Sequence, residues 1–304
     1  MNTIVTKFGG SSLADSIHFK KVKNIIEGNS ERKYVVPSAP GKRFSKDFKV
    51  TDLLYLCHAH VNSGISLDDV FKLISERYHS IVNELDLNFD LNSHLEIIKK
   101  DIENGASVDY AASRGEYLNG LILANYLGID FIDAKDVIKF NKYGSLNMEE
   151  TYSLLKDKLS IHERAVIPGF YGSDEHGDIV TFSRGGSDVT GALVAASINA
   201  KLYENWTDVS GFLMADPRIV ENPKTIGKIT YKELRELSYM GATVLHESAI
   251  FPVRKEGIPI NIRNTNAPQD KGTMIVETTC NKPDCIITGI AGKKGFVSIT
   301  IDKD

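Results

Sequence analysis

Short apolar runs alternate with longer segments of helical period along most of the chain. The apolar runs predict strands over residues 4–8, 34–36, 131–133, 165–167, 179–182, 201–206 and 258–262. The intervening segments predict a helix that Ser11 or Ser12 caps and that ends at Gly28, a helix from Ser187, and a helix over 242–255. This order is typical of an α/β fold in which helices cover a mainly parallel sheet.

A long helical segment interrupts the alternation. Residues 50–128 are predicted to be mostly helical, and Val70, Ile74, Tyr78 and Ile81 fall on one face of a helix within them. We therefore expect a helical lobe beside the sheet.

Composition and charge narrow the class of protein. The chain has 304 residues, 42% hydrophobic and 25% charged, enough for two domains or for one large domain with an appendage. The net charge of -4 gives no basic field, which argues against a nucleic-acid partner. No stretch approaches the ~20 apolar residues of a membrane helix, so we expect a cytoplasmic protein without membrane contact. Cys57, Cys280 and Cys285 are expected to be reduced thiols.

Two glycine pairs follow predicted strands and open predicted helices. Lys7 precedes Gly9 and Gly10, where backbone N–H groups can cradle an anion and the lysine can reach phosphate oxygens. An ordinary turn with an exposed lysine is the alternative. Arg184 precedes the second pair and can grip a carboxylate or phosphate bidentately. The second segment is completed by Gly185, Gly186, Ser187 and Asp188.

Two further segments carry candidate chemistry. Gly115 lies between Arg114 and Glu116 inside a helical stretch, where glycine costs about 1 kcal/mol relative to alanine. Close approach to a ligand is one reason for such a glycine, and the alternative for its neighbours is a solvated pair on the helix surface. Residues 205–218 form a turn-rich loop after a strand, and Trp206 within it is expected in the core. Scattered histidines and the lack of HExxH and GxSxG argue against zinc and serine-hydrolase chemistry.

Taken in order, these segments resemble the motifs of the aspartate kinases in the amino acid kinase family. The matching stretches cover residues 3–276 and are KFGGSS, the Ser38-Ala39 turn, SRGEYLNG, SRGGSD, WTDVSG with DPR, and MGATVLHESAI with IPINIRN. The resemblance implies a three-layer αβα sandwich around a mainly parallel sheet. It implies a catalytic domain over 1–276 whose N-terminal lobe binds the amino acid and whose C-terminal lobe, from about residue 180, binds the nucleotide.

The resemblance also implies an activity. This is transfer of the ATP γ-phosphoryl group to the β-carboxylate of L-aspartate with Mg²⁺ as cofactor, giving 4-phospho-L-aspartate on the route to lysine, threonine and methionine. A β-carboxylate with a pKa of ~3.9 is already ionised at pH 7, so the nucleophile needs no general base. Catalysis then depends on positioning and on neutralising phosphate charge.

Site residues follow from the matching positions. The resemblance implies that Lys7 and Asp188 are catalytic, that Arg184 binds the α-carboxylate of aspartate and that Glu116 binds its ammonium group. It implies that the amino-acid pocket is completed by Thr51, Gly185, Gly186 and Ser187. On the nucleotide side it implies Lys7, Gly9, Gly10, Thr207, Asp208, Arg218, Thr243 and Val244; metal ligands are not assigned.

The chain departs from the family pattern in four places. Thr243 replaces a lysine on the nucleotide side, Leu213 replaces a tyrosine, and the stretch before Thr51 is longer and more basic than usual. Family members continue into two ACT domains that bind a feedback amino acid and help to form dimers. Here Val297, Ile299 and Ile301 alternate with polar residues, so 277–304 is expected to be a linker and the first strand of a truncated ACT region. We expect no inhibition by lysine or threonine, and a homodimer or larger homo-oligomer only where the ACT region is complete.

Two alternatives stay open. One is another amino acid kinase, acting on glutamate or N-acetylglutamate, although Glu116 favours a free ammonium group over an acetylated amine. The other is a non-catalytic amino-acid-binding or assembly module of the same fold.

Overall fold

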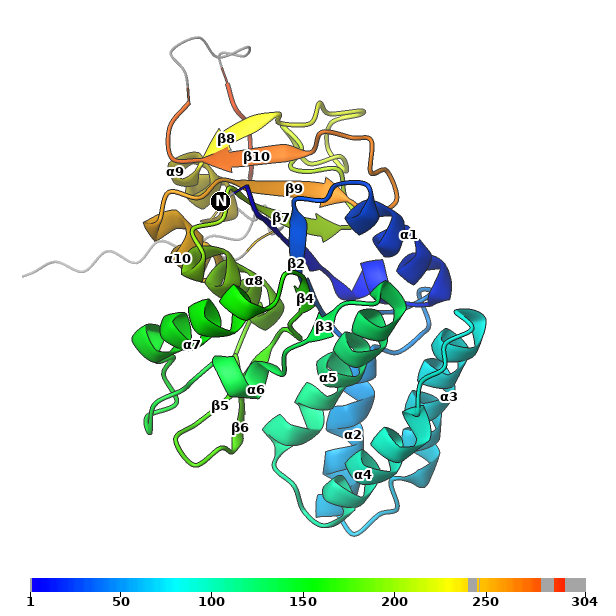
Figure 1. Ribbon diagram of the computed structural model, residues 1–304. Coiled ribbons are helices and arrows are strands. Elements are labelled where there is room, and N and C mark those ends of the chain that lie inside the picture. Colours follow the sequence, from blue (N-terminus) through cyan, green and yellow to red (C-terminus); the bar gives the residue numbers. More distant parts are fainter. Residues whose placement is uncertain (1, 240–244, 246, 280–286, 293–304) are drawn as a thin grey trace, which may run out of the picture.

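An eight-stranded sheet forms the centre of the computed structural model, which describes residues 2–239, 245, 247–279 and 287–292. The strand order is β3-β4-β2-β1-β7-β9-β10-β8 (Figure 1). The strands are β1 (Ile4–Phe8), β2 (Arg32–Pro37), β3 (Asp130–Phe131), β4 (Ala165–Val166), β7 (Leu202–Thr207), β8 (Lys228–Thr230), β9 (Ile260–Asn264) and β10 (Thr273–Val276). Among these described strands only β9 and β10 pair antiparallel. The predicted mainly parallel sheet is confirmed.

Helices cover both faces of the sheet (Figure 1). One layer contains α1 (Ser16–Glu27), α2 (Val50–Asn62), α3 (Asp68–Glu84), α4 (Leu91–Glu103) and α5 (Val108–Leu127). The other contains α6 (Ala134–Val137), α7 (Met148–Ile161), α8 (Gly186–Ser197), α9 (Tyr231–Tyr239) and α10 (Glu247–Lys255). Alternate side chains of a strand point to opposite faces, so Val5 of β1 joins the core beneath the second layer and Phe8 joins the core beneath the first. The three-layer αβα architecture is therefore confirmed.

The expected helical lobe is also present. The helices α2 to α5 account for most of residues 50–128, and Val70, Ile74, Tyr78 and Ile81 of α3 are all buried. Their spacing of three and four residues puts them on one face of α3, where they pack into the same core as β1 and β2.

Two local predictions need correction. The helix expected to start at Ser11 or Ser12 is split into a 3₁₀ helix, η1 (Gly10–Leu13), and α1, whose N-cap is Asp15. The Asp15 carboxylate accepts a hydrogen bond from the backbone N–H of His18 at 3.0 Å, and a carboxylate suits the positive end of a helix. Gly28 ends α1 as expected.

The strand predicted over 179–182 exists but does not belong to the main sheet. β6 (Ile179–Thr181) pairs antiparallel with β5 (Tyr171–Ser173) in a separate two-stranded ribbon. A short β-prone run does not indicate its partner, and here the partner is the segment that follows β4.

The end of the chain is described only in part. The alternating residues Val297, Ile299 and Ile301 lie outside the described residues, as do Cys280 and Cys285. Residues 287–292 form no strand, and the hydroxyl of Thr288 donates a hydrogen bond to Glu233 of α9. The division into two lobes near residue 180 stays a prediction; the sheet itself is continuous, because β7 pairs with β1.

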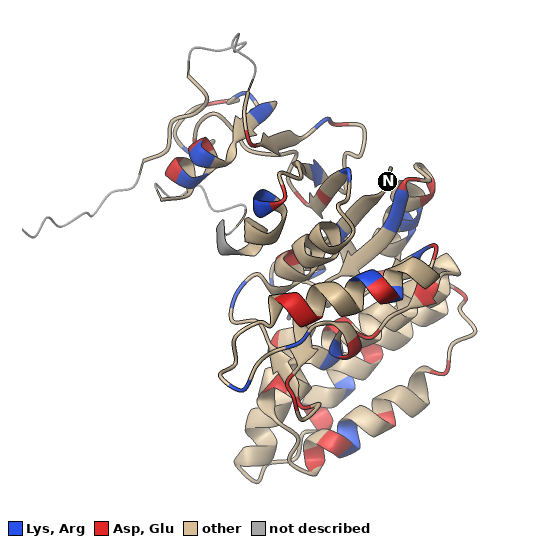
Figure 2. Ribbon diagram, turned by 60° about the vertical axis from the view of Figure 1, so that its left-hand side comes forward, with Lys and Arg blue, Asp and Glu red and all other residues tan. Residues whose placement is uncertain are grey.

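Charges of both signs are interspersed over the surface. In Figure 2 blue and red segments lie close together along the visible helices, as expected for a net charge of -4. None of the helices in the described part of the chain is long and apolar enough to span a membrane.

Candidate active site

An ion pair between a buried lysine and a half-buried aspartate lies at the carboxyl ends of the central strands. Lys7 of β1 is in register with Asn205 of the parallel neighbour β7, so both side chains point to the face that α8 covers. The Lys7 ammonium lies 2.7 Å from Oδ1 of Asp188, in the first turn of α8, and Asn205 Nδ2 donates to the same oxygen at 2.8 Å. Lys7 is only 8% exposed. The lysine is therefore buried rather than exposed, and its contact with phosphate stays a prediction.

The start of α8 depends on both of its glycines, for different reasons. Gly185 adopts a left-handed conformation with φ 57°, which residues with a side chain rarely adopt. A Cβ at Gly186 would lie 2.8 Å from Cα of Phe170, so this glycine is required by packing against the turn after β4. A Cβ at Gly169, in the same turn, would lie 2.6 Å from Cβ of Ser187, so this contact also requires a glycine. The backbone at this helix start is therefore held in one conformation.

The first glycine pair packs against a second turn. The N–H of Gly9 donates to the carbonyl of Trp206 at 3.0 Å, and a Cβ at Gly9 would lie 3.7 Å from the Lys7 ammonium nitrogen. A Cβ at Gly10 would lie only 2.8 Å from the carbonyl oxygen of Ala39, and the N–H of Gly41 donates to the carbonyl of Gly10 at 2.8 Å. The Ser38-Ala39 turn and the two residues after it, Pro40 and Gly41, thus pack against the turn formed by Gly9 and Gly10.

Glu116 is buried on the other side of that turn. It is 5% exposed, and its Oε2 has no hydrogen-bond partner among the described residues. Burial raises the pKa of Glu116 to about 8, although a hydrogen bond from the backbone of Ala39 and the positive charge of Arg114 act in the opposite direction. A carboxyl group in this state favours a cationic partner, because a bound cation would stabilise its ionised form.

Arg114 is buried rather than solvated. Its guanidinium lies 4.5 Å from the ring centroids of both Tyr110 and Tyr117 and 5.3 Å from that of Tyr171, and it donates two hydrogen bonds to Ser113 Oγ. Cation–π contacts of this kind stabilise a desolvated arginine. The expected alternative of a solvated Arg–Glu pair is wrong, because both side chains lie inside the molecule.

Gly115 is explained by packing within the protein. A Cβ there would lie 2.8 Å from Cβ of Ala39 and 3.3 Å from a methyl group of Leu54, so α5 approaches both the turn and α2 closely. The Tyr78 hydroxyl donates to the Gly115 carbonyl at 2.7 Å. The close approach that the sequence indicated is real, but the neighbour is the chain itself rather than a ligand.

The remaining predicted site residues occupy less enclosed positions. Thr51 is half-buried in the first turn of α2, next to Val50, whose N–H donates to the Pro40 carbonyl at 3.2 Å. Arg184 is exposed and makes no hydrogen bond or ion pair within the described part of the chain.

On the nucleotide side, Thr207 ends β7 and its hydroxyl donates to Asp208. The Arg218 side chain is 87% exposed and paired with Asp216 at 2.6 Å. Thr243 and Val244 lie outside the described residues. Trp206 is buried as expected, and its indole N–H donates to Glu204.

Three residues that contact the site were missed at the level of sequence. Asn205 orients Asp188, Asn119 donates to the Ser38 carbonyl at 2.6 Å, and Arg77 reaches the turn from α3. Asn119 lies one helical turn after Glu116, so the spacing of three residues was an available signal. Arg77 gave no signal, because its position beside the turn depends on how α3 packs.

No group of three or more His, Cys, Asp or Glu side chains that could hold a metal occurs in the part of the chain that the structure describes. Mg²⁺ in kinases is commonly held by one or two carboxylates together with substrate phosphates. Asp188 fits such a site. Among the described contacts of its carboxylate, Lys7 and Asn205 both engage Oδ1, and none engages Oδ2.

Cys57 is free and buried, and burial raises the pKa of its thiol to about 12.

Comparison with known proteins establishes the family. Residues 2–264 match the amino acid kinase family, and the chain belongs to it. Aspartokinase 3 of Bacillus subtilis is 39% identical over 98% of this chain and 69% of its own length. The crystal structure of Clostridium acetobutylicum aspartate kinase superposes with a TM-score of 0.91 at 66% identity, over 95% of this chain and 66% of that one.

E. coli aspartokinase III in complex with aspartate and ADP superposes with a TM-score of 0.79 at 26% identity, over 92% of this chain and 65% of that one. The chain therefore spans about two thirds of the length of these relatives.

Proposed function

We propose that this chain is an aspartate kinase, transferring the γ-phosphoryl group of ATP to the β-carboxylate of L-aspartate to give 4-phospho-L-aspartate. Its relatives carry the name aspartokinase, and one of them was crystallised with aspartate and ADP. The single observation that supports the proposal most is the buried Glu116 carboxyl with an unpaired oxygen, separated by the Ser38-Ala39 turn from the glycine turn beside Lys7.

On the aspartate side, we assign Glu116 to the substrate ammonium and Arg184 to the α-carboxylate. The pKa of Glu116 is raised to about 8 by burial, so the group is largely protonated at pH 7 in the free protein. A bound ammonium group stabilises the carboxylate, so binding releases a proton from Glu116. The exposed guanidinium of Arg184 has the planar pair of donors that a carboxylate accepts, and Thr51, Gly185, Gly186 and Ser187 complete the pocket.

On the phosphate side, we assign Lys7 and the N–H group of Gly10 to the oxygens of the transferred group. Gly9 lines the same turn, and its own N–H donates to the Trp206 carbonyl. The ammonium group of Lys7 neutralises charge that gathers on those oxygens, and Asp188 holds that ammonium in place through the 2.7 Å contact. The β-carboxylate is already ionised, so no residue has to remove a proton from it. Thr207, Asp208, Arg218, Thr243 and Val244 are proposed to contact the rest of the nucleotide.

Mg²⁺, when bound with ATP, supplies further neutralisation of the phosphate charge, and Asp188 Oδ2 is the atom that we expect to contribute to holding it. Asn205 supports both roles of Asp188, because its hydrogen bond to Oδ1 fixes the rotation of the carboxylate that contacts Lys7 and would help to hold the metal.

A substrate comparison tests the activity. ADP release, coupled to an indicator reaction, is measured with aspartate, glutamate and N-acetylglutamate at equal concentrations. We expect turnover with aspartate and at least tenfold lower kcat/KM with the other two, because glutamate is one methylene longer and N-acetylglutamate has no free ammonium for Glu116. A preference for either of them would overturn the substrate assignment.

A lysine substitution tests whether the chain is a catalyst rather than a binding module. Lys7→Ala is expected to lower kcat by about 10²–10³, in the range seen when one preorganised donor to a developing charge is removed. Aspartate binding, followed by calorimetry, is expected to persist. Lys20→Ala on the exposed side of α1 is the matched control. Unchanged turnover in Lys7→Ala would remove Lys7 from the mechanism.

A further inference from the structure

The loop between β2 and α2 is held by a buried arginine that belongs to neither element. This β2–α2 loop, residues 38–49, begins with the Ser38-Ala39 turn and leads directly into the first turn of α2, where Thr51 lies. Most of its charged side chains are exposed, but Asp47 is 7% exposed and points into the molecule. A buried carboxylate in a surface loop needs a partner inside the protein.

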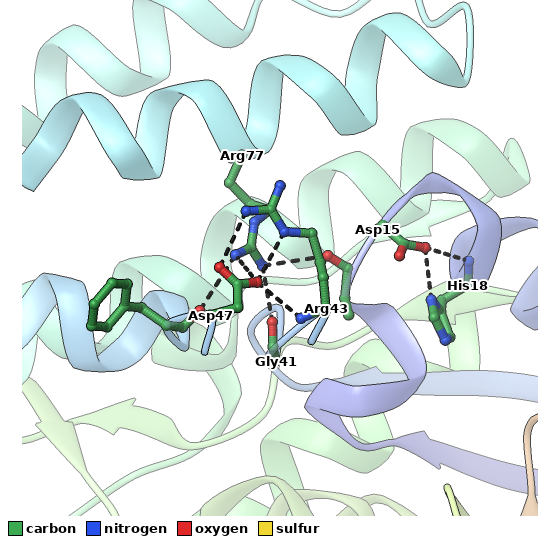
Figure 3. A network of polar contacts seen from close by, with 8 residues as sticks. Asp15, His18, Gly41, Arg43, Asp47 and Arg77 are labelled. Carbon is green, nitrogen blue, oxygen red and sulfur yellow. Dashed lines mark hydrogen bonds and ion pairs between the residues drawn. The ribbon is translucent and has the colours of Figure 1, made fainter. Parts of the chain in front are cut away.

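That partner is Arg77, from the middle of α3 (Figure 3). Its Nη2 lies 2.6 Å from Asp47 Oδ2, and its Nη1 donates to the carbonyl of Gly41 at 2.9 Å and, more weakly, to that of Ala14 at 3.4 Å. Burial alone would raise the pKa of Asp47, but hydrogen bonds from Arg43 and the charge of Arg77 hold it well below its usual range. The Arg77 guanidinium thus connects Gly41, near the start of the loop, with Asp47, near its end, and with Ala14, the residue after η1.

The helix α3 also reaches α5. Tyr78, the next residue along, donates its hydroxyl hydrogen bond to the carbonyl of Gly115, adjacent to Glu116. Gly41, which Arg77 holds, donates in turn to the carbonyl of Gly10. Two consecutive residues of α3 therefore fix the positions of the turn and of the helix between which Glu116 is buried.

Arg43 binds the same carboxylate as Arg77 but makes fewer contacts with the rest of the protein. It also donates to Asp47, at 2.9 and 3.1 Å, but its side chain is 39% exposed and none of the contacts described for it reaches Gly41 or Ala14. An ion pair alone is therefore already supplied by Arg43. What only Arg77 adds is the connection from Asp47 to the backbone on which the glycine turn and the Ser38-Ala39 turn rest.

We propose that Arg77 is a positioning residue for the amino-acid substrate, acting through the β2–α2 loop without touching the substrate itself. The inference rests on the proposed function, in which Thr51 and Glu116 line the aspartate pocket. A buried ion pair adds little net stability compared with apolar residues, so its use here is explained by the geometry that it imposes. An ammonium group cannot reproduce that geometry, because it lacks the planar donor fork that spans Asp47 and the Gly41 carbonyl.

The test compares charge-conserving and charge-removing variants at both arginines. Arg77→Lys, Arg77→Met, Arg43→Lys and Arg43→Met are purified as full chains, and thermal unfolding, aspartate KM, ATP KM and kcat are measured for each. We expect Arg77→Lys to recover most of the stability that Arg77→Met loses but still to raise the aspartate KM at least fivefold. The ATP KM is expected to rise less than the aspartate KM, because the described contacts of Arg77 reach the glycine turn through the hydrogen bond from Gly41 to Gly10. Both Arg43 variants are expected to keep the aspartate KM within twofold of the original chain.

Three results would overturn the proposal. These are an unchanged aspartate KM in Arg77→Lys, equal rises of the aspartate and ATP KM, and an equal effect of Arg43→Lys. Calorimetric titration with aspartate separates this proposal from the proposed function, because it needs no turnover. If the original chain binds aspartate without turnover, the kinase assignment fails while the difference between Arg77→Lys and Arg43→Lys in affinity still decides the role of Arg77. Absence of aspartate binding would remove both.

Discussion

The two sides of the candidate site are built differently. On the aspartate side, the polar groups around the β2–α2 loop are buried and joined to one another, with Arg77 4% and Glu116 5% exposed. On the nucleotide side, the Arg218 side chain lies in solvent after β7, and among the described residues it is paired only with Asp216. The hydrogen bonds of Arg218 reach a residue two positions away, whereas Arg77 bonds across 30 and 36 positions to Asp47 and Gly41. Uncharged residues anchor the same stretch, because the Ser210 hydroxyl donates to Asp270 and the Phe212 N–H donates to Thr273.

This difference indicates where the site is formed before substrate binds. Groups that are fixed by long-range buried contacts lose little further conformational entropy on binding, whereas exposed side chains must be ordered by the ligand. The aspartate side is therefore expected to respond strongly to single substitutions. The exposed Arg218 of the nucleotide-side loop is expected to respond weakly.

The largest effect is expected for Glu116→Gln. Loss of a buried charge partner typically costs 2–5 kcal/mol, so the aspartate KM should rise by about 10²-fold or more.

The same substitution should make the folded protein more stable, although it weakens substrate binding. The pKa of Glu116 is about 8 in the folded protein and near its ordinary 4.5 in the unfolded chain, so between these pH values only the unfolded chain releases the proton. The original chain should therefore lose stability relative to Glu116→Gln as pH rises from about 5 to 8.

Urea unfolding at pH 5 and pH 8 measures this change. The stability advantage of Glu116→Gln over the original chain should grow by a few kcal/mol between the two conditions, since one pKa unit corresponds to about 1.4 kcal/mol. Glu96→Gln, an exposed position on α4, is the control. A constant difference across the pH range would show that Glu116 is ionised in the free protein.

An intermediate effect is expected for Gly115→Ala. In an unobstructed helix this change stabilises by about 1 kcal/mol, but here the new methyl would lie 2.8 Å from Cβ of Ala39. Overpacking of this kind typically costs about 1–3 kcal/mol, so the sign of the change should reverse. Urea unfolding gives the number, and Gly227→Ala, where a Cβ meets nothing within 4 Å, should change stability by less than about 0.5 kcal/mol. Stabilisation by Gly115→Ala would contradict the tight contact between α5 and the turn.

The smallest effect is expected for Arg218→Ala. Because this side chain is exposed and pairs only with Asp216 among the described residues, the midpoint of urea unfolding should not move. The ATP KM should rise about threefold if Arg218 contacts the nucleotide, with Lys224→Ala as the exposed control. A loss of more than tenfold would mean that this loop is as firmly built into the site as the aspartate side, and the contrast between the two sides would fail.

Local patterns were sufficient for much of the fold. The run 4–8 and the glycine pair after it were predicted as a strand and a turn, and β1 ends at Phe8 as expected. The mostly helical character of residues 50–128 was predicted, and for α3 it followed from the spacing of Val70, Ile74, Tyr78 and Ile81, which lie on one buried face. The resemblance implied that Lys7 and Asp188 are both catalytic, and the structure brings their side chains within 2.7 Å of each other.

Contacts between segments that are distant in the sequence could not be predicted from local patterns. The reason for Gly115 is Ala39, 76 positions earlier, and the reason for Gly186 is a turn that follows β4. Asp15 rather than Ser11 or Ser12 caps α1, because both serines belong to η1. Each of these depends on how two backbones approach, which periodicity does not encode.

By itself the sequence determined the α/β class, the two glycine turns and the residue types that handle carboxylate and phosphate, because these depend on local backbone chemistry and on the order of motifs. Only the tertiary structure decided that Glu116 and Arg114 are buried, that Glu116 keeps an unpaired oxygen, and that Arg77 holds the β2–α2 loop. Desolvation and long-range hydrogen bonds set the pKa of Glu116 and the position of the loop, and both arise only when α3, α5 and the loop pack together.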